Sequence, residues 1–232
     1  MLDALVIKKR RDYTVEVALR LGPGEAVGLF GASGTGKSTV LSCLAGIETP
    51  DDGYIKLGDL QLFPPSLPLH HRPLGYLTQE PNLFPHLTVK QNVCFGVSGL
   101  NHGEQSRWIA ELKDRLGLTP FWNASAARVS GGQARRVALA RMLVRRPPLV
   151  LLDEPFGGLD RQIVRELIGD LLGWSRDLGF SMIAIDHQAD ILERICPRAL
   201  VLEKGKVVQE GTWEELHSSP ATPLLRSLLE PV

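Results

Sequence analysis

Cysteine is scarce in this sequence: Cys43, Cys94 and Cys196 are its only three cysteines, and they lie far apart in a chain of 232 residues. No C-x-x-C spacing occurs, which argues against both a zinc site and a disulfide framework. Separated cysteines of this kind are typical of proteins that keep reduced thiols in the cytosol. The sequence therefore predicts a cytosolic protein whose fold does not depend on disulfides.

An excess of positive charge is also absent. The chain has 26 Lys and Arg residues against 26 Asp and Glu residues, so its formal net charge is zero. Proteins that bind nucleic acid through the phosphate backbone are usually basic. We therefore expect no nucleic-acid partner.

Long apolar runs are missing as well. No stretch approaches the roughly 20 apolar residues that a membrane-spanning helix needs, and the N-terminal sequence "MLDALVIKKRRD" does not resemble a signal peptide. With 44% hydrophobic residues, the chain suits a single globular domain over residues 1–232. If this protein serves a membrane process, we expect it to act from the water side through a partner.

Hydrophobic patterning along the chain predicts an α/β fold. Residues 13–21 alternate apolar and polar side chains as a half-buried strand does, and 26–30 and 149–153 are short apolar runs typical of buried parallel strands. Residues from about 80 to 146 show mostly helical spacing. The other predicted elements are a helix ending at Gly46, a hairpin around Gly58-Asp59, a helix at about 161–178, a strand at 181–186 followed by another helix, a hairpin around Lys204-Gly205, and two C-terminal helices broken by Pro220 and Pro223.

The stretch "GASGTGKST" has the pattern G-x-x-x-x-G-K-[ST] and lies between a predicted strand and a predicted helix. Glycines let successive backbone N–H groups turn toward a phosphate chain, and the start of the helix adds a favourable dipole. Lys37 is expected to bridge the terminal phosphates, and the Ser38 hydroxyl to bind Mg²⁺. The predicted nucleotide-binding residues are Gly31, Ala32, Ser33, Gly34, Thr35, Gly36, Lys37, Ser38 and Thr39.

Two acidic residues follow the apolar strand in "LVLLDEP". A carboxylate at the end of a buried strand needs compensation, which Mg²⁺ beside the phosphates would provide, so Asp153 is predicted to serve the metal. Successive strand side chains point to opposite faces, which favours Glu154 as the base or water-positioning group. The alternative is that these carboxylates cap the next helix. Kinases, GTPases and motors share both motifs, but no guanine-reading N-K-x-D segment occurs.

The stretch "VSGGQ", residues 129–133, resembles the Leu-Ser-Gly-Gly-Gln signature of ATP-binding-cassette (ABC) proteins. Around it lie other family motifs in the expected order: Gln79 after "GYLT", "GGLD" at 157–160, and His187 after the strand "MIAID". The resemblance covers nearly the whole chain. It implies a P-loop NTPase core of the ABC type with an antiparallel β subdomain and a helical subdomain at about 80–146, and an ATPase with ATP and Mg²⁺ as cofactors.

The resemblance also implies that two chains associate head to tail. Ser130 is expected to cap a helix that starts at Gly131, which leaves N–H groups free for an anion. In the family this signature faces the ATP of the other chain, so two ATP molecules lie in the interface. The residues assigned to this role are Val129, Ser130, Gly131, Gly132 and Gln133.

Further roles come from the family alone. His187 is implied to contact the γ-phosphate, Gln79 to reach the Mg²⁺ and water site from a loop that meets the membrane partner, and Asp160 to communicate across the dimer. Tyr13 is the candidate for stacking on adenine, although it lies closer to Gly31 than is usual. Gly157-Gly158, in place of Ser-Ala, and Gln188, in place of an Asp, also depart from the family pattern.

A single short cassette resembles the separate ATPase subunit of a bacterial importer. Residues 63–96 resemble the ATPases of oxyanion importers, particularly those for molybdate. This implies integral membrane permease subunits and an extracytoplasmic solute-binding protein as partners, with the chain held at the inner face of the membrane. A small-molecule kinase, disfavoured by the signature and His187, and a non-transport ABC-class regulatory ATPase remain the alternatives.

Overall fold

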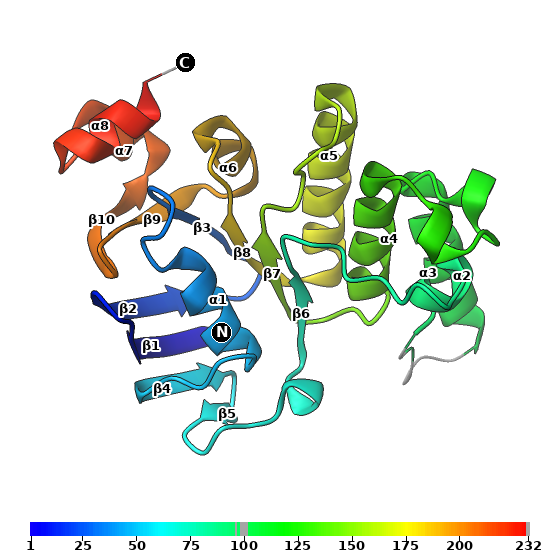
Figure 1. The fold of residues 1–232 in the computed structure, drawn as a ribbon, viewed down its shortest axis with the longest axis horizontal. Coiled ribbons are helices and arrows are strands. Elements are labelled where there is room, and N and C mark those ends of the chain that lie inside the picture. The colour runs from blue at the N-terminus through cyan, green and yellow to red at the C-terminus, as the bar shows by residue number, and fades with distance from the viewer. Residues whose placement is uncertain (96, 98–101, 231–232) are drawn as a thin grey trace.

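The computed structural model describes residues 1–95, 97 and 102–230 and folds them around one sheet (Figure 1). Ten strands form this sheet in the order β5-β4-β1-β2-β10-β9-β3-β8-β7-β6. The strands are β1 (Leu2–Lys9), β2 (Thr14–Leu21), β3 (Ala26–Phe30), β4 (Asp52–Leu57), β5 (Leu60–Phe63), β6 (Leu74–Leu77), β7 (Leu149–Asp153), β8 (Ser181–Ile185), β9 (Arg198–Glu203) and β10 (Lys206–Thr212).

The sheet has a parallel part and an antiparallel part. Strands β9, β3, β8, β7 and β6 pair in parallel, whereas β5, β4, β1 and β2 pair antiparallel. Strand β10 joins the two parts, because it pairs antiparallel with β9 and meets β2 through the single parallel pair Lys206 and Glu16. Every residue of β3, β7 and β8 is buried, as expected of parallel strands covered on both faces.

Helix α1 (Lys37–Ala45) lies in the curl of the sheet and contacts β7 as well as β1 and β2 (Figure 1). Its buried residues include Val40, Leu41 and Leu44, which join one of the two hydrophobic clusters of the core. Gly46 ends the helix in the left-handed conformation that only glycine adopts readily. The helix start is thereby fixed beside the carboxyl ends of the parallel strands.

The second hydrophobic cluster covers the other face of the parallel strands. It is built with helices α5 (Arg161–Leu178), α6 (Ala189–Ile195), α7 (Trp213–Ser218) and α8 (Pro223–Leu229). Phe30 at the end of β3 meets Trp213 edge to face, with ring centroids 5.7 Å apart. The C-terminal helices are therefore part of the core that supports the end of β3.

A helical part extends from the β6 edge of the sheet (Figure 1). It contains α2 (Val89–Val93), α3 (His102–Arg115) and α4 (Gly131–Leu143). Trp108 of α3 donates its indole N–H to the carbonyl of Leu143 at 3.1 Å and packs edge to face on Trp174 of α5. Among the residues that the structure describes, no helix is long and apolar enough to cross a membrane.

The predicted elements are confirmed, with two differences. Residues 2–9 form strand β1, which the sequence analysis did not assign, although Leu2, Ala4 and Val6 alternate with less buried side chains. The two C-terminal helices are separated at Pro220 and Pro223 as predicted, and Pro223 is the first residue of α8, a position where its missing N–H has no partner to lose. The predicted helix running to residue 146 ends at Leu143. Residues 96 and 98–101 of the helical region lie outside the described part of the chain.

Arg72 is a fully buried cation that the sequence analysis did not single out. Its guanidinium donates to the carbonyl oxygens of Cys43 at 2.9 Å and Leu44 at 2.6 Å, in the last turn of α1, and to that of Leu67 at 2.8 Å. The last carbonyls of a helix have no partner within it, so Arg72 satisfies the end of α1. A Cβ on Gly46 would lie 2.4 Å from Arg72 Nε, which is why a glycine fits there.

Replacing Arg72 by methionine should therefore destabilise the fold. Arg72→Met removes the donor to the carbonyl oxygens of residues 43, 44 and 67, and the free energy of unfolding should fall by about 3 kcal/mol. Urea denaturation followed by circular dichroism measures this change. The control is Arg20→Met, because the Arg20 side chain is 83% exposed and its loss should change the free energy by less than about 0.5 kcal/mol. Equal effects of the two substitutions would contradict this role of Arg72.

Candidate functional site

The loop of residues 31–39 runs from β3 into α1 and presents its backbone at the helix start. Gly36 stands at φ 102° just before α1, and no side chain caps the helix there. A Cβ at Gly36 would lie 2.7 Å from Val15, and one at Gly31 would lie 2.3 Å from the carbonyl oxygen of Leu202. Glycine is therefore required at both positions. The N–H groups of the first turn of α1 remain available to an anion.

Lys37 lies across this loop. Its Nζ donates to the carbonyl oxygens of Gly31 and Ala32, each at 2.7 Å. Burial lowers the pKa of Lys37, while the negative charges of Asp153 and Glu154 oppose that shift. The cation thus lies where a phosphate chain along the loop would meet it.

The other predicted loop residues differ in exposure. Ser33 and Gly34 are exposed at the loop tip. Thr35 is buried, and its hydroxyl donates to the carbonyl of Ala32 at 2.9 Å. Thr39 Oγ1 accepts a hydrogen bond of 2.7 Å from Arg10, which also pairs with Glu48. Thr35 and Thr39 therefore already have partners within the protein, and any contact they make to a nucleotide stays a prediction.

Asp153, the last residue of β7, lies next to the start of α1. Ser38 Oγ donates to Asp153 Oδ1, and the Tyr76 hydroxyl donates to Oδ2, both at 3.4 Å. Burial raises the pKa of Asp153 despite these two hydrogen bonds. Tyr76 was missed by the sequence analysis, although it stands in "GYLT" directly upstream of Gln79.

These groups fit the predicted Mg²⁺ ion. A hydroxyl and a carboxylate, both hard oxygen donors, converge at this point, and a buried carboxylate is compensated by a cation. Within the described residues, no group of three or more His, Cys, Asp or Glu side chains could hold a metal. Mg²⁺ commonly binds one or two protein ligands and takes its remaining ligands from substrate phosphates and water. Ser38 and Asp153 have the chemistry for such a site.

Glu154 follows Asp153 but does not continue the strand. Its φ is 48°, and its backbone N–H donates to the carbonyl of Ile185 at 2.9 Å. Alternation along the strand therefore does not separate the two carboxylates, as was predicted; a turn of the backbone after Asp153 does. Gln79 Nε2 donates to Glu154 Oε2 at 3.2 Å. The structure thus brings Gln79 to Glu154, whereas the role of Gln79 toward a metal stays a prediction.

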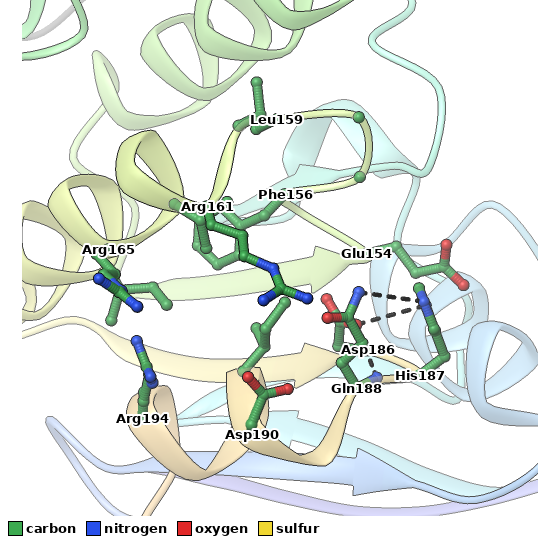
Figure 2. Close-up of a pocket in the computed structure, with 15 residues that line it drawn as sticks. Glu154, Phe156, Leu159, Arg161, Arg165, Asp186, His187, Gln188, Asp190 and Arg194 are labelled. Carbon is green, nitrogen blue, oxygen red and sulfur yellow. Dashed lines mark hydrogen bonds and ion pairs between the residues drawn. The ribbon is translucent and has the colours of Figure 1, made fainter. Parts of the chain in front are cut away.

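Glu154 and His187 line one pocket of about 630 Å³ between α5 and α6 (Figure 2). His187 is exposed; its Nδ1 lies 3.5 Å from the carboxylate of Asp186 and its Nε2 lies 3.3 Å from the amide of Gln188. Asp186 is buried, which raises its pKa. In Figure 2 the Glu154 and His187 side chains lie at the same end of the pocket, so both can face one reacting group there.

Ser130 caps α4 as predicted. Its hydroxyl accepts from the N–H of Gln133 at 3.3 Å, and the Gln133 side chain accepts from the N–H of Ser130 at 2.9 Å. Gly131 and Gly132 open the helix, whereas Val129 packs beneath it against the core. Figure 1 shows α4 and α1 apart, with β6 and β7 between them. The signature residues therefore do not close over the phosphate loop of their own chain.

Asp160 caps the next helix, because its carboxylate accepts from the N–H of Gln162 at 2.8 Å. The turn before it contains Gly157 and Gly158, and Gly158 has a φ of 76° that favours glycine. The alternative that Asp153 or Glu154 caps the next helix is therefore wrong, because the capping carboxylate of α5 is that of Asp160. Its role across a dimer stays a prediction.

Tyr13 lies against the phosphate loop. Its hydroxyl donates to the carbonyl of Gly34 at 2.5 Å, and its ring is partly buried near Gly36 and Gly205. This arrangement holds the tip of the loop, and stacking of Tyr13 on adenine stays a prediction.

Two arginines of α4 were also missed by the sequence analysis. Arg141 donates to the carbonyls of Pro81 at 3.0 Å and Asn82 at 2.8 Å. Arg135 is buried and donates to the carbonyl of Thr78 at 2.8 Å. Together they fasten the segment that carries Gln79 to the helix that carries Ser130. The run "GGQARRVALARM" predicts the helix, but nothing in it indicates which arginines point inward.

The geometry at Asp153 predicts opposite effects of one substitution on stability and on hydrolysis. Because burial disfavours the charged carboxylate, Asp153→Asn should make the protein more stable to heat in EDTA. This gain should be largest above the raised pKa of Asp153 and shrink as pH falls through it. Mg²⁺-dependent ATP hydrolysis should fall by at least about a hundredfold. A less stable variant with unchanged hydrolysis would contradict this assignment of Asp153.

The chain was compared with known proteins. Residues 15–157 match the ABC transporter family. A thiamine import ATP-binding protein of Jannaschia sp. (strain CCS1) is 38% identical over 218 residues, which cover 93% of this chain and 94% of that protein. A sulfate/thiosulfate import ATP-binding protein of Thermosynechococcus vestitus is 36% identical and a molybdenum import ATP-binding protein of Rhodospirillum rubrum is 34% identical, over 94% and 96% of this chain. This chain spans only 65% and 61% of those two proteins.

Comparison with solved structures gives the same family. An ATP-binding cassette in a dimeric, post-hydrolysis state bound to ADP and Pi is 27% identical with a TM-score of 0.79, over 91% of this chain and 98% of that one. The ATP-binding subunit of an ABC transporter, 24% identical with a TM-score of 0.85 over 98% of this chain and 97% of that one, shares the fold. The matched family, the relatives and the phosphate-binding geometry lead to one conclusion: the chain belongs to the ABC transporter family and is an ATP-binding-cassette ATPase that uses ATP with Mg²⁺.

Proposed function

We propose that this chain is the nucleotide-binding subunit of a solute importer, which dimerises head to tail around two MgATP and drives a membrane permease. This proposal rests on five side chains that converge at one end of the parallel strands: Lys37, Ser38, Asp153, Glu154 and Gln79. A solved relative of the same family is dimeric, and several relatives are named import ATP-binding proteins.

Each side chain has a specific task in hydrolysis. Lys37 and the first turn of α1 bind the phosphates, while Ser38, Asp153 and Gln79 hold Mg²⁺. When bound by these residues, Mg²⁺ would neutralise charge on the phosphate oxygens. Glu154 accepts a proton from the attacking water or orients it, and Gln79 positions Glu154 through their 3.2 Å hydrogen bond. His187, in the same pocket, contacts the γ-phosphate.

The second chain completes the phosphate site. Because α4 starts away from the loop of its own chain (Figure 1), Ser130 and the free N–H groups that follow it serve the ATP bound by the partner. Gln133 keeps the Ser130 cap in place. Asp160, directly after the turn of Gly157 and Gly158, lies at the contact between the two chains. This arrangement buries both nucleotides between the chains.

The permease contacts an apolar groove beside the Gln79 loop. A pocket of about 400 Å³ opens there, lined by Thr78, Phe84 and Phe95 among others. Leu69 and Phe95, which also line it, are 49% and 54% exposed. Arg141 fixes this loop by its bonds to residues 81 and 82. A permease segment bound in this groove moves with the segment that carries Gln79. The same contact holds the chain at the inner face of the cell membrane.

The proposed cargo is an oxyanion of the molybdate or tungstate type, delivered by an extracytoplasmic solute-binding protein. Support comes from residues 63–96, whose last residue lies outside the described part of the chain, and from the molybdenum and sulfate relatives. A thiamine relative is 38% identical, more than the molybdenum and sulfate relatives. Direct binding of molybdate, sulfate and thiamine to a solute-binding protein encoded beside this chain would distinguish these cargoes.

Replacing Glu154 by glutamine tests the proposed dimer and the catalytic step together. Glu154→Gln keeps the size of the side chain and removes its charge, so hydrolysis should fall by about 10²–10⁴ while MgATP still binds. Slow hydrolysis should trap the ATP-bound dimer, which size-exclusion chromatography with and without MgATP detects.

The matched control is Glu193→Gln, because Glu193 pairs with His217 on the surface and is not assigned to the site. This variant should hydrolyse ATP at the wild-type rate and show no trapped dimer. A wild-type rate in Glu154→Gln would transfer the catalytic role to another residue, with His187 the first alternative. A variant that binds MgATP yet stays monomeric would contradict the dimer.

A further inference from the structure

Arg135 is a buried cation that none of the tasks above uses. It lies one turn into α4 and is 7% exposed. No carboxylate of the described residues lies within ion-pair distance of it, and its Nη1 donates instead to the backbone carbonyl of Thr78 at 2.8 Å. Burial lowers the pKa of Arg135, and the charges of Glu154 and Asp153 oppose that shift. A guanidinium charge that is buried against a backbone carbonyl is unfavourable unless nearby negative charges stabilise it.

The side chain of Arg135 connects three functional segments. Its backbone belongs to the helix that Ser130 caps. Its Nη1 holds Thr78, the residue before Gln79. Its Nη2 lies 3.5 Å from the place where a Cβ on Gly157 would stand, so the guanidinium lies beside the turn that follows Glu154. The signature helix, the Gln79 loop and the Glu154 turn therefore meet at one side chain.

A second contact joins the helix start to the same turn. A Cβ on Gly132 would lie 3.1 Å from the Leu159 side chain, and the turn is closed by the bond from the N–H of Leu159 to the carbonyl of Phe156 at 3.1 Å. The first turn of α4 is thus packed on the turn between Glu154 and Asp160. A shift of this helix start must move or strain that turn, because packed segments do not deform independently.

We propose that Arg135 is a positioning residue that couples the two ATP sites of the dimer. When Ser130 engages the nucleotide of the partner chain, Arg135 transmits the position of α4 to Gln79 and Glu154 of its own chain. Hydrolysis at one site is thereby faster when the other site also holds nucleotide. This inference rests on the head-to-tail dimer proposed above, and it adds a residue and a direction of coupling to it.

The neighbouring arginine provides a matched control. Arg136 lies on the same helix, but its Nη1 donates to the carbonyl of Leu116 at 3.1 Å and its guanidinium covers the ring of Phe121 at 5.8 Å. Both partners belong to the helical part of the fold. Removing Arg136 therefore removes a largely buried arginine from α4 without touching Thr78 or Gly157.

The experiment compares the full-length variants Arg135→Met, Arg135→Lys and Arg136→Met. ATP hydrolysis gives kcat, KM and the Hill coefficient for MgATP, and thermal unfolding reports stability. Arg135→Met should lower kcat by about tenfold, the loss expected for one charge-assisted hydrogen bond. Its KM should stay within about twofold, and its Hill coefficient should fall toward 1. Arg135→Lys retains a donor for Thr78 and the charge, so it should recover part of kcat and of the Hill coefficient.

Three results would overturn the coupling role. The first is wild-type kcat and Hill coefficient in Arg135→Met. The second is a change confined to KM, which would assign Arg135 to nucleotide binding. The third is an equal loss of kcat and Hill coefficient in Arg136→Met, which would reduce Arg135 to a structural role. If the wild-type chain stays monomeric with MgATP, both the dimer and the coupling are overturned. If the wild-type chain dimerises but the Arg135 variants keep the wild-type kcat and Hill coefficient, only the coupling is overturned.

Discussion

The open first turn of α1 beside a buried carboxylate is the constraint on which the rest of the structure depends. Gly31 and Gly36 adopt backbone angles and close contacts that a side chain would obstruct. The parallel strands place Asp153 against Ser38 at that point, and burial makes its charge unfavourable. The free N–H groups of the first turn of α1 on one side and a buried carboxylate on the other favour a phosphate chain that carries Mg²⁺.

Local sequence predicted the elements whose physics is local. The phosphate loop, the alternating strand β2, the Ser130 cap and the glycine at the end of α1 were all predicted because each depends on neighbouring residues. Contacts between distant segments were not predictable in this way. Arg72 satisfies carbonyls of residues 43 and 44, and Tyr13 bonds to Gly34; neither pairing leaves a periodic signal. The left-handed backbone conformation of Glu154 was not predicted, because the sequence indicates only a buried strand that ends in two acidic residues.

Coupling between the catalytic loops and the helical part passes through α4. Arg135 and Arg141 attach this helix to the segment around Gln79, and Gly132 packs it on the turn after Glu154. The apolar groove that we propose for the permease lies on the same segment, since Thr78 and Phe84 line it. A change at the phosphates can therefore reach the groove through the hydrogen bonds that the side chains of Arg135 and Arg141 donate to backbone carbonyls of this segment.

Mixed dimers test most directly whether each phosphate site is completed by the other chain. A Lys37→Ala dimer has two defective phosphate loops, and a Ser130→Arg dimer has two defective signatures. A dimer of one chain of each kind has one intact loop facing one intact signature. Single-turnover ATP hydrolysis by the mixture should therefore exceed the sum of the two separate variants. Activity no greater than that sum would contradict the head-to-tail arrangement.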